Sequence, residues 1–141
     1  HSLVACQWRH QINVLSEMLE HAKIPFCTIS ANDTAEKRNN TVEQFQAGHF
    51  RALIAHPATA AHGLTLTRAR SVIWASPTFN SEHYLQFNRR IYRIGQTNRT
   101  EIIHVVCEGT IEKDVYDALN NKVKHEFNIL KLFEKGLNIY V

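Results

Sequence analysis

The alternation of short apolar runs with amphipathic segments constrains the fold of this chain more than any other feature of its sequence. Five runs have the length and composition of buried strands, and they cover residues 3–6, 24–29, 51–55, 71–75 and 101–107. Strands that alternate with helices predict an α/β fold, with a mainly parallel sheet of about five or six strands and helices on both faces. Sheets of this kind bind ligands at the carboxyl ends of their strands.

Helices are predicted from apolar spacing and from the residues that start and stop them. The first covers residues 12–19, and the second is capped by Asp33 or Thr34 and ends at Gly48. A later helix begins at Thr110, and its pattern extends to residue 132. Residues 1–135 are therefore predicted to form one domain, and residues 136–141 a short tail.

Size and composition are those of one folded domain. The chain has 141 residues, of which 44% are hydrophobic and 21% charged, and no apolar run is long enough to span a bilayer. The first residue is His1 rather than Met, so we expect a piece of a longer protein. Three cysteines without metal-type spacing predict reduced, buried thiols and an intracellular compartment.

Arginine dominates the charge of the middle of the chain. Between Glu43 and Glu101 the only acidic residue is Glu82, and there is no lysine. Seven arginines lie in this stretch: Arg51, Arg68, Arg70, Arg89, Arg90, Arg93 and Arg99. Because the guanidinium group binds phosphate in bidentate fashion, the stretch predicts phosphate contacts, and a solvated basic face is the alternative.

The segment 86–96 carries the most specific chemistry. It belongs to a helix predicted to begin after Asn80 or Ser81 and to run through residue 94, where Gly95 ends it. Gln86, Arg90 and Arg93 then lie at i, i+4 and i+7, so they project from one face. Two neighbouring arginines without an acid repel each other, and a polyanion such as a triphosphate would stabilise them.

This segment resembles motif VI of the Swi/Snf-type branch of superfamily 2 helicases. Upstream, residues 57–66 resemble motif V, and Thr78-Phe79-Asn80 stands where the family often has an acidic residue, Trp and Asn. Weaker similarity covers residues 3–8, 33–45 and 109–112. His56-Pro57-Ala58 and Tyr92 further resemble bacteriophage-encoded members.

The resemblance implies the C-terminal RecA-like lobe of an ATP-dependent DNA translocase. ATP with Mg²⁺ would bind between this lobe and an N-terminal RecA-like lobe of the same protein, which would hold the metal, because this chain has no phosphate-binding Gly-rich loop. Arg93 is the implied arginine finger, Arg90 would also reach the γ-phosphate, and Gln86 would orient the phosphate or water. Gly63 would bring the backbone close to the nucleotide. The implied DNA-backbone contacts are Thr59, Ala60, Arg9, Arg68 and Asn80.

Departures from the family pattern keep other interpretations open. Ala60 and Ala61 replace a frequent Gly-Gly, Thr65 a frequent Asn, and Ser76 a frequent Asp, so a degenerate lobe that only binds DNA or a partner is the alternative function. An unrelated small-molecule domain would leave the arginine spacing unexplained. We expect DNA and the N-terminal lobe as partners, no membrane and no metal site in this chain, and a cytoplasmic location in bacterial or phage-infected cells, or a nuclear one in a eukaryote.

Overall fold

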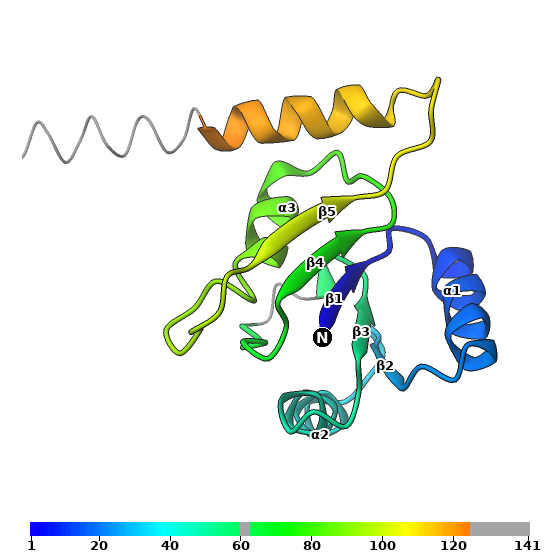
Figure 1. The fold of residues 1–141 in the computed structure, drawn as a ribbon, viewed down its shortest axis with the longest axis vertical. Coiled ribbons are helices and arrows are strands. Elements are labelled where there is room, and N and C mark those ends of the chain that lie inside the picture. The colour runs from blue at the N-terminus through cyan, green and yellow to red at the C-terminus, as the bar shows by residue number, and fades with distance from the viewer. Residues whose placement is uncertain (60–62, 125–141) are drawn as a thin grey trace, which may run out of the picture.

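Five parallel strands form the sheet of the computed structural model, which describes residues 1–59 and 63–124. The strands are β1 (Ser2–Ala5), β2 (Phe26–Ile29), β3 (Ala52–Ala55), β4 (Ser71–Trp74) and β5 (Glu101–His104). Their order is β2-β3-β1-β4-β5, and every neighbouring pair is parallel (Figure 1). The predicted α/β fold is confirmed.

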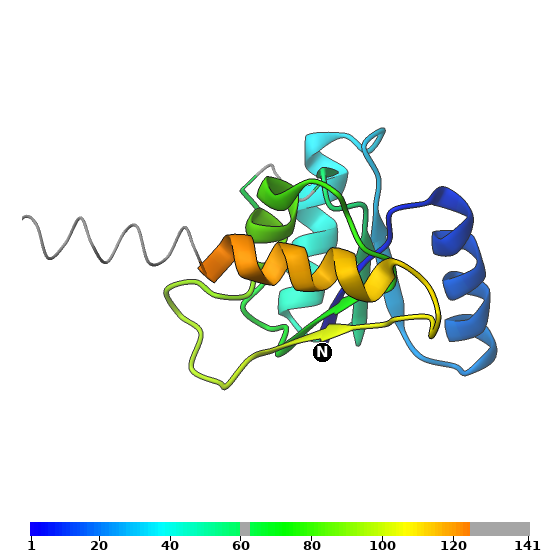
Figure 2. The ribbon, with the colours of Figure 1, turned by 90° about the horizontal axis from the view of Figure 1, so that it is seen from above.

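Helices cover both faces of the sheet. They are α1 (Arg9–His21), α2 (Ala35–Gln46), α3 (Ser81–Asn88) and a helix over residues 112–124. Side chains on one sheet face, such as Leu3 and Leu53, pack in one core with α2, α3 and the 112–124 helix, whereas Val4 and Ile54 on the other face pack against α1. Figure 2 shows α1 set apart from the other helices.

The predicted caps form at the start of α2 and α3. Thr34 Oγ1 accepts a hydrogen bond from the backbone N–H of Lys37 at 3.2 Å, and Asn80 Oδ1 accepts one from His83 at 3.0 Å. These bonds satisfy N–H groups that have no partner inside a helix. The sequence allowed Asp33 or Thr34 as the first cap and Asn80 or Ser81 as the second. The structure shows that Thr34 and Asn80 are the capping residues.

The third helix ends earlier than predicted. α3 stops at Asn88 rather than at residue 94, and Arg90 and Arg93 lie in the turns that follow it. The carbonyl of Arg90 accepts from the backbone N–H of Leu66 at 3.0 Å, and that of Ile91 accepts from the side-chain amide of Gln96 at 3.1 Å. In a helix through residue 94 the Arg90 carbonyl would accept from the Ile94 N–H, so the bond from Leu66 takes the place of a helical bond. The prediction that one helical face presents Gln86, Arg90 and Arg93 is therefore wrong.

The remaining boundaries differ by a few residues. β5 ends at His104, three residues before the predicted end of the strand, and the final helix begins at residue 112. This helix extends to residue 124, the last described residue before 125–141, and the rest of its predicted continuation to residue 132 and the tail at 136–141 lie outside the described residues. Within the described part of the chain, no helix is long and apolar enough to cross a membrane.

Candidate functional site

Two loops that are distant in sequence lie against each other beside the sheet. One loop leads into β4 and includes residues 63–70, and the other connects α3 to β5. The Leu66 N–H donates to the Arg90 carbonyl at 3.0 Å, and the Leu66 and Ile91 side chains are fully buried in the core. The structure thus brings together the segments that resemble motifs V and VI.

Arg90 is a buried cation that forms no ion pair with any described residue. Its side chain is 5% exposed, and its Nε has no hydrogen-bond partner among the described residues. Burial, and then the charge of Arg93, lower the pKa of this guanidinium. Arginine nevertheless stays protonated in proteins, and an unpaired buried charge is strongly unfavourable. An anion bound at this position would remove that penalty.

Arg93 lies beside Arg90 but faces the surface. Its side chain is exposed, and Nη1 donates to Thr65 Oγ1 at 3.3 Å. This bond ties one guanidinium to the neighbouring loop and leaves its other donors available. The pair therefore combines a buried and an exposed guanidinium, a combination suited to an anion with several oxygens.

Gln86 and Gly63, the other two residues predicted to contact the nucleotide, form no hydrogen bonds with the arginine pair among the described residues. Gln86 Nε2 donates to Glu82 Oε1 at 2.9 Å, one turn earlier on α3, and no hydrogen bond joins Gln86 to Arg90 or Arg93 within residues 81–99. Gly63 has a φ of +75°, a conformation that favours glycine, and no described atom lies within 4 Å of a Cβ built there. The described residues thus leave the space beside Gly63 open.

A second basic site occupies the carboxyl ends of β1, β2 and β3. It is a groove of about 450 Å³, and its polar lining includes Arg9, Arg38, Ser30, Asn32, His56 and Thr59. Arg38 Nη2 donates to the Ala31 carbonyl at 2.8 Å, and its buried Nε has no partner in the described part of the chain. Sequence analysis identified Arg9 and Thr59 but missed Arg38. The available signal was the position of Arg38 in the helix after β2, because the carboxyl ends of neighbouring strands share one edge.

Backbone contacts restrict what the Thr59 region can donate. The Thr59 N–H donates to the His56 carbonyl at 2.9 Å, and the Ala58 N–H to His56 Nδ1 at 3.1 Å. Burial, and then His83, lower the pKa of His56, which favours its neutral form. Ala60, the other predicted amide donor, lies outside the described residues, as do Ala61 and His62.

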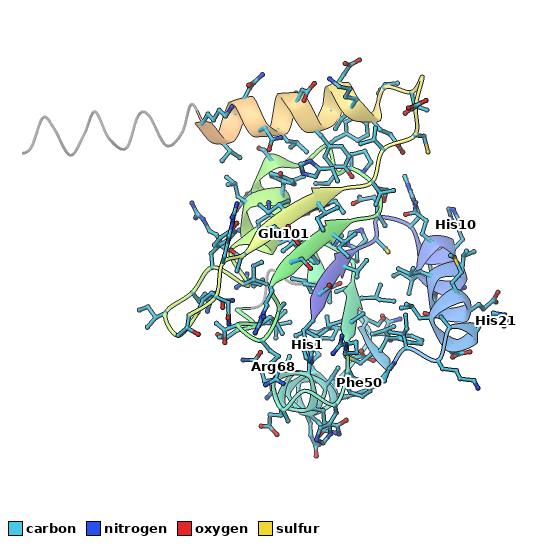
Figure 3. All side chains as sticks on the ribbon, viewed as in Figure 1. His1, His10, His21, Phe50, Arg68 and Glu101 are labelled. Atoms are coloured by element: carbon cyan, nitrogen blue, oxygen red, sulfur yellow. The ribbon has the colours of Figure 1, made fainter. Side chains whose placement is uncertain are left out.

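Neither Arg68 nor Asn80 lines this groove. The Arg68 guanidinium lies over Gly48 at the end of α2, where a Cβ on the glycine would be 2.6 Å from Nη2. Figure 3 shows Arg68 near His1, whereas His10, which follows Arg9, lies on α1. Asn80 uses its side-chain oxygen to cap α3. Among the described residues, no group of three or more His, Cys, Asp or Glu side chains could hold a metal ion.

Comparisons with known proteins agree with this arrangement. The family model for the helicase conserved C-terminal domain matches residues 1–95. Protein CHROMATIN REMODELING 24 of Arabidopsis thaliana is 32% identical over 115 residues, which are 81% of this chain and 11% of the relative. Chromodomain-helicase-DNA-binding protein 1-like of Danio rerio is 26% identical over 124 residues, 88% of this chain and 12% of that protein. The chain thus spans about a tenth of these relatives, and a plant and a fish protein give the predicted bacteriophage-type membership no support.

A solved structure shows the same fold. The crystal structure of the C-terminal part of the Fun30 ATPase domain superposes with a TM-score of 0.77 at 20% sequence identity. The match covers 82% of this chain and 38% of the solved chain. At this identity the likeness establishes the fold alone.

Proposed function

Because this chain belongs to the helicase conserved C-terminal domain family, as the C-terminal lobe of a Swi/Snf-type helicase, we propose that it donates Arg90 and Arg93 to an ATP-hydrolysing site. The observation that carries the proposal is the buried Arg90 guanidinium, whose Nε has no partner among the described residues and which lies beside Arg93. An N-terminal RecA-like lobe of the same protein would complete the site.

The arginine pair fits the phosphates of ATP, while the described residues offer no cluster of metal ligands. Mg²⁺ would therefore be held by the N-terminal lobe, and it would neutralise charge on the phosphate oxygens. In this chain Arg90 would hold the phosphate from the interior, and Arg93 would stabilise the charge that develops on the transferred phosphoryl group. An arginine finger contributes about 10³- to 10⁵-fold in rate.

Two further residues complete the proposed nucleotide contacts. The open space beside Gly63 would let the backbone approach the nucleotide without a side chain in between. Gln86 would exchange its hydrogen bond with Glu82 for one to the γ-phosphate or the attacking water. The exchange would cost little free energy, because the bond to Glu82 lies on an exposed helix surface.

The groove at the carboxyl ends of β1, β2 and β3 is the proposed DNA contact. Arg9 and Arg38 would neutralise backbone phosphates, with Thr59 and Asn32 supplying neutral donors. The buried Nε of Arg38, which has no partner among the described residues, supports this assignment. Phosphate contacts carry no sequence information, so the lobe would track DNA of any sequence.

DNA-stimulated ATPase activity of the full-length protein tests the nucleotide assignment. We expect Arg93→Ala to lower kcat by about 10³-fold and to leave DNA binding intact. Arg89→Ala is the matched control, because Arg89 is exposed and lies next to Arg90, and it should hydrolyse ATP like the wild type. Unchanged hydrolysis in Arg93→Ala would favour the degenerate, binding-only lobe. Robust hydrolysis by the 141-residue chain alone would contradict the proposed division between lobes.

Salt-dependent DNA binding tests the groove. Replacing Arg9 and Arg38 together by Gln should reduce the slope of log K against log [salt] by about 2, because each lost phosphate contact lowers it by about 0.9. Replacing Arg51 and Arg70 together by Gln removes the same charge from exposed residues at the amino ends of the strands, so this variant serves as the control for overall charge. An unchanged slope in the double variant would exclude the groove as the DNA site.

A further inference from the structure

The Gln96 side chain makes four hydrogen bonds, more than any other described side chain of the candidate site. Its Nε2 donates to the carbonyls of Thr67 at 3.0 Å, Ala69 at 3.0 Å and Ile91 at 3.1 Å. Its Oε1 accepts from the Asn98 N–H at 3.1 Å. An amide nitrogen has two hydrogens, so two carbonyls share one of them, and the capacity of the amide to donate is fully used inside the protein.

These acceptors lie on both loops of the site. Thr67 and Ala69 belong to the loop that also carries Thr65, the hydrogen-bond partner of Arg93. Ile91 lies between Arg90 and Arg93 in sequence. Gln96 therefore joins the segment that carries both arginines to the segment that holds one of them.

Local geometry directs the Gln96 side chain inward. Gly95 has a φ of +101°, in the left-handed region, and the chain turns there before Gln96. Gln96 N–H donates to the Arg93 carbonyl at 3.0 Å, which closes the turn around Arg93 and Gly95. The side chain is half-buried and reaches back to the two loops.

We propose that Gln96 is a positioning residue that keeps the Arg90–Arg93 segment in register with the Thr65–Ala69 segment. The inference rests on the proposed function, since it concerns the geometry of the same arginines, but Gln96 itself would not touch the nucleotide. Without its bonds, the hydrogen bonds between the two loops that remain among the described residues are Leu66–Arg90 and Thr65–Arg93. A displacement of about 1 Å at a catalytic group can lower the rate by about 100-fold.

The test compares three substitutions in the full-length protein. Gln96→Met has a similar shape but no donors, so we expect kcat to fall by about 10- to 100-fold while KM for ATP stays within about twofold. Gln96→Glu places a carboxylate against three carbonyl oxygens, so it should lower kcat more than the other two substitutions. Gln96→Lys offers three N–H donors to three carbonyls, so it should restore most of kcat.

Gln46→Met is the matched control for loop stability. Gln46, at the end of α2, bonds to the same loop through Thr67 Oγ1 at 3.0 Å and the Arg68 N–H at 2.9 Å, and none of its side-chain hydrogen bonds among the described residues goes to the arginine segment. Its variant should keep the wild-type kcat when assayed well below its unfolding temperature. Positioning by Gln96 therefore predicts a loss of kcat that Gln46→Met does not reproduce.

Three results would overturn the inference. They are a wild-type kcat in Gln96→Met, an equal loss in Gln46→Met, and no recovery in Gln96→Lys at the same thermal stability. In each case Arg93→Ala would still be inactive, so the proposed function would survive. An Arg93→Ala variant that hydrolyses ATP normally would instead overturn the proposed function, and the positioning role with it.

Discussion

Replacing Asn88 should destabilise the protein through one buried hydrogen bond. Trp74 is fully buried and Asn88 is 5% exposed, and Trp74 Nε1 donates to Asn88 Oδ1 at 2.9 Å. Asn88→Ala leaves the indole N–H buried without an acceptor, which costs about 1–3 kcal/mol. For a domain of this size that free energy corresponds to a fall in Tm of roughly 4–12 °C.

A double-mutant cycle isolates this bond from the other effects of the substitution. Urea unfolding, followed by circular dichroism, would be measured for Asn88→Ala, Trp74→Phe and the double variant. We expect a coupling free energy of about 1 kcal/mol. Asn39→Ala, on the exposed surface of α2, should change stability by less than about 0.5 kcal/mol. Strictly additive effects of the two substitutions would show that the hydrogen bond contributes nothing.

Three further predictions concern the strained backbone at Gly48, the half-buried His104 and the three cysteine thiols. Gly48→Ala should lower the free energy of unfolding by about 1–2 kcal/mol, because φ is +89° at this position; an unchanged Tm would contradict it. Burial lowers the pKa of His104, so below a pH of about 6.5 the unfolded chain binds a proton that the folded chain does not, and the free energy of unfolding decreases as the pH is lowered. His104→Phe should therefore lose less Tm than the wild type between pH 7 and pH 5, and an equal loss of Tm in the two proteins would refute this. Burial raises the pKa of Cys6 to about 11 and of Cys27 to about 12, so Ellman's reagent at pH 8 should react rapidly with the exposed Cys107 alone, and rapid reaction at all three thiols of the folded chain would contradict the burial.

The sheet and its helices were predictable because their signals are local. Each observed strand lies within or next to a predicted apolar run, and the caps at Thr34 and Asn80 were among the residues identified. A buried parallel strand is apolar along its whole length, so composition alone reveals it. Helix starts carry a polar side chain at a fixed position, which sequence also shows.

The end of α3 was not predictable from local signals. The segment 89–94 contains no proline and ends at Gly95, so sequence favours a helix that runs to this glycine. Leu66 and Gln96 compete for the carbonyls of Arg90 and Ile91, and Leu66 comes from a loop more than twenty residues away in the sequence. Tertiary hydrogen bonds therefore override the local preference, and only the structure reveals them.

The early end of α3 changes the argument for the arginine pair. On a continuous helix, both guanidinium groups would lie on the same face with similar exposure. Exposed charges of this kind are often hydrated without binding a ligand. The turn instead buries Arg90 to 5% exposure and leaves Arg93 exposed, within hydrogen-bonding distance of Thr65. A solvated face does not explain a buried guanidinium whose Nε lacks a partner within the described structure, whereas a bound anion does. The turn that replaces the predicted end of the helix thus gives the phosphate interpretation its strongest physical support, because it is the turn that buries Arg90.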